Sequence, residues 1–211
     1  MKLYSYFRSS ASFRVRIALA LKNIAVELQP IHLLKQGGEH KLPSYADLNP
    51  QKLVPVLQLD DGTVIGQSLA IMEYLEECYP TPALLEGDAV HKAKIRAFCQ
   101  AIACDIHPLN NLRVLAYLNQ QLHVTAEQKT EWYQHWVTLG FEAIEAMLGD
   151  DTFCFGDTPS MADCCLIPQV YNAKRFDCDL TAFPKIVRIY EHCMSLPAFI
   201  SASPEQQPDA N

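Results

Sequence analysis

The sequence has no basic excess, no long apolar run and no amino-terminal pattern of a signal peptide. Its 17 Lys and Arg residues are outnumbered by 24 Asp and Glu residues, which gives a formal net charge of −7. Binding to nucleic acid or to an anionic membrane surface relies on clustered positive charge, so we expect neither partner. No apolar run approaches the roughly 18 residues of a membrane span, and Met1–Ser5 leads directly into a strand-like pattern. We therefore expect a cytoplasmic protein without a membrane anchor.

Cysteine is absent before Cys78, and the eight cysteines of the chain form no Cys-x-x-Cys pair. Without a secretory signal, such cysteines are expected to be reduced and mostly buried. The segment Cys104–His107 contains metal-ligating residue types, but no second pair at a suitable spacing accompanies it. Structural zinc sites need four ligands, so we predict no metal site.

The first 80 residues predict alternating strands and helices. Leu3–Phe7 is aromatic-rich and typical of a strand, and Ser12–Leu21 has the composition of a helix that Ser9, Ser10 or Ser12 could cap. The further predicted elements are a strand at Val26–Leu33, a loop with a short helix at Lys35–Ala46, strands at Val54–Leu59 and Thr63–Ile65 joined by a hairpin at Asp60–Gly62, and a helix capped by Ser68. A crossover needs parallel pairing and a hairpin antiparallel pairing, so this α/β sheet is predicted to be mixed.

The pattern after residue 80 is helical throughout. Tyr79–Pro82 contains two prolines and cannot continue a helix, so we place an α/β domain at 1–80, a linker at 81–89 and an all-α domain at 90–211. The predicted helices are Val90–Leu118 with a kink at Pro108, Thr125–Leu148, Cys164–Val170 after a capping box at Ser160–Asp163, and Pro184–Met194. The tail from Ser201 is proline-containing and is expected to be frayed.

Serines cluster in the segment Arg8–Ser12, between the first predicted strand and helix. Backbone N–H groups and the helix dipole favour an anion at such a position. A thiolate is one such anion, and hydroxyl groups stabilise it further. A serine-rich helix cap without a ligand is the alternative explanation of the same residues.

Three further segments could contact a ligand. Pro55 interrupts a good strand, which is expected if the bond after Val54 is cis and the backbone of Val54 pairs with a peptide-like ligand; an edge strand with a trans proline is the alternative. Gln67–Ser68 begins a helix and could bind a carboxylate or simply cap that helix. His107–Asn111 is equally consistent with a cleft wall and with a kinked surface helix.

Taken in order, these segments resemble the zeta-class glutathione transferases, a class that includes maleylacetoacetate isomerase. The resemblance begins at Tyr4–Leu19 (YSYFRSSASFRVRIAL) and covers nearly the whole chain. Its further segments are Leu48–Pro50, Val54–Pro55, Gln67–Ile71, Glu73–Glu77, Tyr79–Pro82, Leu84–Leu85, Ile106–Leu112, Gly156–Asp157, Met161–Asp163, Pro168–Val170, Ala173–Phe176 and Asp179–Thr181. Matches in this order are far more specific than any single motif.

The resemblance implies a thioredoxin-like domain of order β-α-β-α-β-β-α, then a helical bundle domain, in a homodimer that binds glutathione. Ser9 and Ser10 would lie beside the glutathione sulfur, Val54 would pair with the cysteinyl backbone, and Gln67 and Ser68 would bind the γ-glutamyl end. The full set of implied glutathione-contacting residues is Ser9, Ser10, Ala11, Ser12, Phe13, Arg14, His40, Val54, Pro55, Gln67, Ser68, His107, Asn111, Leu112 and Arg113.

The implied activity is the cis–trans isomerisation of maleylacetoacetate to fumarylacetoacetate, a step of tyrosine and phenylalanine catabolism. A thiolate from glutathione would add reversibly to the alkene, the adjacent carbonyl would take the charge, and rotation followed by elimination would restore the alkene. Ser9 and Ser10 would lower the thiol pKa. The guanidinium groups of Arg8 and Arg175 would bind the dicarboxylate substrate, although a surface salt bridge is the alternative role of Arg175.

The chain departs from the class at Ala11, where the usual motif has a cysteine. A mechanism in which glutathione supplies the sulfur does not need that cysteine. Glutathione-dependent maleylpyruvate isomerase of gentisate catabolism also lacks it and resembles this chain at Cys104–Pro108, so it is the first alternative. A glutathione transferase acting on small electrophiles such as α-haloacids, and a non-catalytic glutathione-binding module, are the others.

Overall fold

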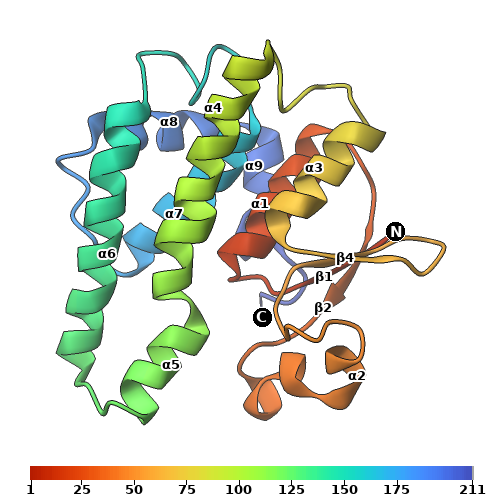
Figure 1. The fold of residues 1–211 in the computed structure, drawn as a ribbon, viewed down its shortest axis with the longest axis vertical. Coiled ribbons are helices and arrows are strands. Elements are labelled where there is room, and N and C mark those ends of the chain that lie inside the picture. The colour runs from red at the N-terminus through yellow and green to blue at the C-terminus, as the bar shows by residue number, and fades with distance from the viewer. Residues whose placement is uncertain (211) are drawn as a thin grey trace. The chain divides into compact units, whose positions relative to one another are not determined.

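A four-stranded mixed sheet forms the centre of the amino-terminal unit of the computed structural model, which describes residues 1–210 (Figure 1). The strands are β1 (Lys2–Ser5), β2 (Glu27–Pro30), β3 (Val56–Gln58) and β4 (Val64–Gly66), in the order β2-β1-β3-β4. The β1–β2 pair is parallel, with Leu3 opposite Leu28, and the β1–β3 and β3–β4 pairs are antiparallel. The predicted mixed sheet is confirmed.

Two helices, α1 (Ser10–Leu21) and α3 (Ser68–Cys78), pack against each other on one face of this sheet (Figure 1). Their contact with the sheet is apolar, through the fully buried side chains of Leu3, Ile17, Leu57, Ile71, Met72 and Leu75. Short 3-10 turns at Lys35–Gly37 and Glu39–Lys41 and the helix α2 (Pro43–Ala46) complete the predicted β-α-β-α-β-β-α order. This is the thioredoxin-like topology that the sequence predicted.

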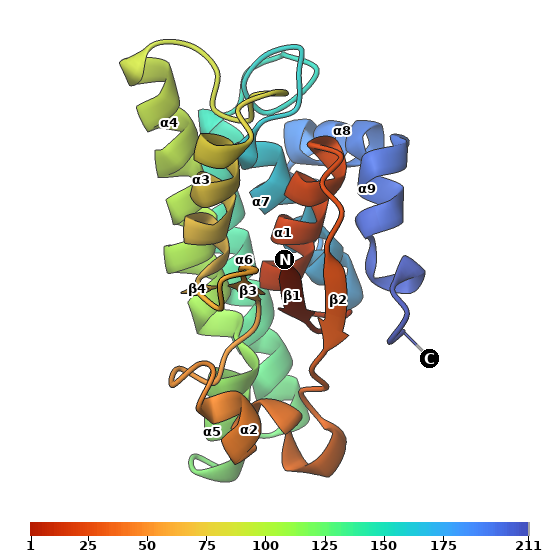
Figure 2. The same cartoon turned by 90° about the vertical axis from the view of Figure 1, so that its right-hand side faces the viewer.

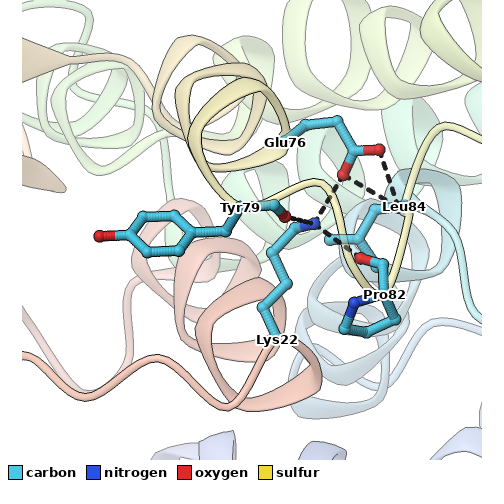
Figure 3. Close-up of polar contacts among 5 residues, drawn as sticks. All are labelled: Lys22, Glu76, Tyr79, Pro82 and Leu84. Atoms are coloured by element: carbon cyan, nitrogen blue, oxygen red, sulfur yellow. Dashed lines mark hydrogen bonds and ion pairs between the residues drawn. The ribbon is translucent and has the colours of Figure 1, made fainter.

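A buried ammonium group fixes the end of this unit (Figure 3). Lys22, at the carboxyl end of α1, donates to the carbonyls of Tyr79 and Pro82, both at 2.7 Å, and pairs with Glu76 at 2.8 Å. The carboxylate of Glu76 in turn accepts the backbone N–H of Leu84. The proline-rich segment after α3 is therefore anchored by main-chain bonds to one lysine and one glutamate.

The carboxyl-terminal segment packs with the amino-terminal unit, and the prediction that it is frayed is wrong. Contacts group the chain into residues 1–84 with the segment from Met194, and residues Leu85–Cys193. The helix α9 (Pro197–Ala202) contacts α1 (Figure 2). The side chain of Gln207 is buried and donates to the carbonyls of Ser201 and Ser203. Prolines do not fray a segment whose polar groups find hydrogen-bond partners inside the fold. The domain boundaries 1–80, 81–89 and 90–211 stay a prediction.

The second unit is helical. Its helices are α4 (Ala89–Gln100), α5 (Leu112–Gln120), α6 (Ala126–Met147), α7 (Met161–Arg175) and α8 (Pro184–Cys193). The capping box predicted at Ser160 begins α7, and a second capping box begins α6 at Thr125. The fully buried Asp163 accepts the N–H groups of Cys154 and Ser160, so α7 is tied to the loop before it. In the described part of the chain, no helix is long and apolar enough to cross a bilayer.

The helix predicted over Val90–Leu118 with a kink at Pro108 is interrupted more extensively than a kink. After α4 the chain forms a π-helix at Ala101–Ile106 and a 3-10 helix at His107–Asn110, and α5 begins only at Leu112. Pro108 lacks an N–H and cannot continue an α-helical ladder, and Asn111 caps α5 by accepting the N–H of Arg113. The cysteines follow the prediction: all eight are free, and six are buried.

Lys22→Met is expected to destabilise the protein by about 3 to 5 kcal/mol, because it leaves the carboxylate of Glu76 without its cation in a site where the lysine side chain is fully buried. Urea unfolding followed by circular dichroism measures the change. Lys2→Met is the matched control, since Lys2 pairs with Glu27 at the surface, and should change stability by less than about 1 kcal/mol. Equal losses in the two variants would contradict the structural role of Lys22.

Candidate functional site

Ser9 is the amino-terminal cap of α1. Its Oγ accepts the N–H of Ser12 at 3.2 Å, and its backbone carbonyl accepts the N–H of Phe13 at 2.9 Å. Within residues 1–210 no acceptor takes the hydroxyl proton of Ser9, whose side chain is half-buried. The first turn of α1 contains no acidic residue, so the positive end of the helix dipole is not neutralised there. Ser9 and this turn therefore offer a hydroxyl donor and backbone N–H groups to an anion.

The buried guanidinium of Arg16 organises the loop between β1 and α1. Its Nη1 donates to the Oγ of Ser5 and the carbonyl of Tyr6, and its Nη2 donates to the carbonyl of Phe7 at 3.0 Å. Its Nε donates to the carbonyl of Ala202 at the end of α9. One planar group with several donors thus fixes consecutive carbonyls just before the Arg8–Ser9–Ser10 segment.

A second anchored loop presents the backbone of Val54. The bond between Val54 and Pro55 is cis, as predicted. The carbonyl of Leu53 accepts the hydroxyl of Tyr45 at 2.6 Å and the amide of Asn49 at 2.8 Å. Burial raises the pKa of Tyr45, so that its hydroxyl stays a donor. Because the C=O and N–H of one trans peptide point in opposite directions, fixing the carbonyl of Leu53 also fixes the direction of the Val54 N–H.

The backbone of Val54 is available for pairing. Neither its N–H nor its C=O has a hydrogen-bond partner among residues 1–210, and the residue is only half-buried. Such a group pairs readily with another extended backbone, as edge strands do. The structure therefore supports the predicted contact of Val54 with a peptide-like ligand, which stays a prediction.

The start of α3 differs from the prediction in its cap. Gln67, not Ser68, is the cap residue, and it has φ +68° and ψ 120°. Non-glycine residues rarely adopt a positive φ, and such residues concentrate at functional sites. Ser68 is the first helical residue, and its Oγ accepts a hydrogen bond from Nη1 of the buried Arg14 at 3.2 Å. This hydrogen bond joins α1 to the start of α3. Ser9 and Gln67, which cap these two helices, therefore belong to the same structural unit.

The other residues predicted in this unit have different exposures. Ser12, Phe13 and Arg14 are buried side chains of α1, whereas Ala11 is half-buried in its first turn. His40 lies in the 3-10 turn Glu39–Lys41, and partial burial together with the charge of Lys41 lowers its pKa. Both effects favour the neutral imidazole of His40. Arg8 is exposed, with its guanidinium over the ring of Phe7.

The remaining predicted residues lie in the helical unit. Nε2 of His107 and Nδ2 of Asn111 are 3.3 Å apart, and Leu112 and Arg113 are exposed in the first turn of α5. Arg175, in the last turn of α7, is exposed and donates to Oδ1 of Asn172 at 3.3 Å. No ion pair in the described part of the chain includes Arg175, so the surface salt bridge considered as its alternative role is absent there.

The sequence does not mark as functional the residues that fix these loops. They are Arg16, Tyr45, Asn49 and Asp209, of which Asp209 accepts the N–H of Phe7. Arg16 alone had a usable signal, because a charged residue amid the apolar Phe13–Leu21 run must be buried with partners. Tyr45 and Asn49 act through the carbonyl of Leu53, which is close in sequence, and Asp209 acts through the N–H of Phe7, which is far away; no sequence pattern marks any of the three as functional.

Comparison with known proteins places the chain in a family. Its residues 8–78 match the model of the glutathione S-transferase N-terminal domain, and residues 138–192 match that of the C-terminal domain. A maleylacetoacetate isomerase of Pseudomonas aeruginosa is 49% identical over 99% of this chain and 98% of its own. The chain therefore belongs to the glutathione S-transferase family.

The solved structures similar to this chain include a member of the zeta class of this family. The holo structure of maleyl pyruvate isomerase, described as a bacterial zeta-class glutathione S-transferase, has a TM-score of 0.95 and 45% identity, with 100% of both chains covered. A maleylacetoacetate isomerase of Anaeromyxobacter dehalogenans with glutathione in its active site has a TM-score of 0.89 and 40% identity, covering 100% of this chain and 97% of its own. The predicted family and fold are confirmed.

Arg16→Lys is expected to lower the free energy of unfolding by about 2 to 4 kcal/mol, because an ammonium group cannot reach all the acceptors of the guanidinium and leaves buried carbonyls unpaired. Chemical denaturation measures the loss. Arg188→Lys is the control, since the exposed Arg188 also donates to two carbonyls, and should stay within about 0.5 kcal/mol of the parent. A parent-like Arg16→Lys would contradict the role of Arg16.

Proposed function

We propose that this protein is a glutathione-dependent cis–trans isomerase that converts maleylacetoacetate to fumarylacetoacetate. The observation that carries the proposal is the similarity to maleylacetoacetate isomerases over almost the full length of both chains, together with a helix start at Ser9 that can bind an anion. We further propose a cytoplasmic homodimer that acts in tyrosine and phenylalanine catabolism, as the resemblance implies.

The residues present fit glutathione. A tripeptide needs a backbone partner, and the unpaired N–H and C=O of Val54 provide one. Its γ-glutamyl carboxylate needs donors, which the N–H groups at the start of α3, beside Gln67 and Ser68, can supply. When bound, glutathione would supply the nucleophilic thiol that the chain lacks at Ala11.

The proposed catalytic residues act on the thiol or on the substrate. Ser9 donates its hydroxyl to the thiolate, and the amino terminus of α1 adds N–H groups and its dipole, so the thiol pKa falls. Ser10 is placed in the first turn of the same helix. Arg8 and Arg175 bind the carboxylates of the substrate and the charge that develops on its carbonyl, for which planar guanidinium groups are suited.

Maleylpyruvate is the second candidate substrate. The similarity to a maleyl pyruvate isomerase covers both chains fully, and the two substrates share the maleyl and keto groups that the proposed residues would bind. A transferase acting on small electrophiles such as α-haloacids would use the same thiolate in substitution instead of reversible addition.

An ultraviolet assay of both isomerisations, with and without glutathione, tests the proposal. Turnover of maleylacetoacetate only when glutathione is present is expected, with a higher kcat/KM than for maleylpyruvate. The reverse preference would reassign the substrate. Absence of turnover with both compounds, while glutathione still binds, would reject the isomerase and leave a transferase or a binding module.

Ser9→Ala is expected to lower kcat by about 10- to 100-fold, the effect of losing one hydrogen bond to a charged group, and to destabilise α1 by about 1 kcal/mol through the lost cap. Ser9→Asp separates the two effects. Asp caps a helix as well as Ser does, but its carboxylate disfavours a neighbouring thiolate.

Steady-state kinetics across pH distinguish the outcomes. Ser9→Asp should keep the stability of the parent and shift the thiol-dependent limb of the pH–kcat/KM profile to higher pH. A parent-like profile in both variants would show that Ser9 does not act on the thiol.

Arg175→Ala is expected to raise KM for the dicarboxylate by about tenfold or more, the effect of losing an Arg–carboxylate bond, with KM for glutathione unchanged. Initial-rate kinetics with each substrate varied measure both constants. Lys174→Ala is the control, because Lys174 is an adjacent exposed cation that lies over the ring of Tyr190. Equal changes of KM in the two variants would mean that the number of positive charges, and not a specific bond from Arg175, determines substrate binding.

A further inference from the structure

Asp209 lies 202 residues after Phe7 in the sequence but contacts it directly. Its Oδ2 accepts the backbone N–H of Phe7 at 3.0 Å. Phe7 is buried, and β1 ends at Ser5, so no neighbouring strand accepts this N–H. Hydrogen bonds between a backbone N–H and a carboxylate are among the stronger ones in proteins.

Hydrogen bonds fix the position of the segment around Asp209. Gln207 is buried and bridges the carbonyls of Ser201 and Ser203, and the carbonyl of Gln207 accepts the N–H of Ala210. The same segment is tied to α1 where Arg16 donates to the carbonyl of Ala202. Hydrogen bonds of the neighbouring residues Gln207 and Ala210 therefore hold the backbone on both sides of Asp209 in place.

The peptide between Tyr6 and Phe7 is fixed at both of its edges. Its carbonyl accepts the N–H of Ser9 at 2.9 Å and a longer bond from Arg16, and its N–H donates to Asp209. Because a peptide unit is planar, rotation of this unit would move its carbonyl away from the N–H of Ser9. Loss of the Asp209 carboxylate therefore loosens the backbone bond from the N–H of Ser9 to the carbonyl of Tyr6, which helps to position Ser9 as the cap of α1.

We infer that Asp209 is a positioning residue. Its carboxylate fixes the peptide between Tyr6 and Phe7. That peptide in turn orients Ser9 and the start of α1 toward the thiol. The catalytic part of this inference rests on the proposed function. Asp209 itself touches no reacting atom.

Two variants and one control test the inference. Asp209→Ala removes the acceptor, whereas Asp209→Asn keeps an oxygen that can accept the N–H of Phe7. Gln206→Ala changes an exposed side chain of the same segment. Amide hydrogen exchange at Phe7 and Ser9, and the pH profile of kcat/KM, are measured in all three and in the parent.

Asp209→Ala should accelerate exchange at Phe7 and Ser9, lower kcat by about 5- to 10-fold, as for one weakened hydrogen bond, and move the thiol-dependent limb to higher pH. Asp209→Asn should restore most of both properties, and Gln206→Ala should match the parent. Parent-like exchange at Ser9 in Asp209→Ala would overturn the inference, as would faster exchange with kcat and the pH profile unchanged.

The exchange measurement separates this inference from the proposed function. If the parent isomerises neither maleyl compound, the proposed function fails. Faster exchange at Ser9 in Asp209→Ala alone would then still support the positioning of Ser9 by Asp209. Unchanged exchange at Ser9 in Asp209→Ala would overturn the positioning of Ser9 by Asp209, whether or not the parent is active.

Discussion

The guanidinium of Arg16 is the interaction on which the candidate site depends. It donates to the carbonyls of Tyr6 and Phe7 before the site and to Ala202 at the end of α9. A buried charge is stabilised only when its donors are used, so the guanidinium and these carbonyls satisfy one another. The strand end, the start of α1 and the carboxyl-terminal segment are consequently joined through one guanidinium. Ser9 is oriented by that assembly and by its own cap bond to Ser12.

Other side chains of the amino-terminal unit orient backbone groups in the same way. Tyr45 and Asn49 fix the carbonyl of Leu53 and thereby direct the backbone of Val54. Lys22 and Glu76 fix the segment that leaves α3. In each case a side chain buried in the fold binds a carbonyl or an N–H, and the neighbouring backbone is left oriented. Preorganised backbone groups of this kind stabilise charge without having to reorient during a reaction.

Much of this unit could be predicted from the sequence, because its signals are local. Alternating apolar residues, the hairpin at Asp60–Gly62 and the capping serines report on neighbours in the chain, and the sheet and α1 agree with them. The cap of α3 is Gln67, one residue before the predicted Ser68, since a positive φ at Gln67 has no sequence pattern. The packed tail could not be predicted either, and the kink predicted at Pro108 lies within a longer break that separates α4 from α5. The burial of Arg16 has a sequence signal, but its bond to Ala202 and the bond of Asp209 to Phe7 join residues distant in sequence, and single-sequence patterns carry no such information.

The most direct test of the central claim is an ultraviolet titration of the thiolate of glutathione bound to the unaltered protein. Free thiols of cysteine have a pKa of about 8.5. If Ser9 and the start of α1 stabilise the thiolate, the bound thiol titrates well below this value. A bound thiol that titrates like free glutathione would contradict the account, because the fixed loop would then bind the tripeptide without activating it.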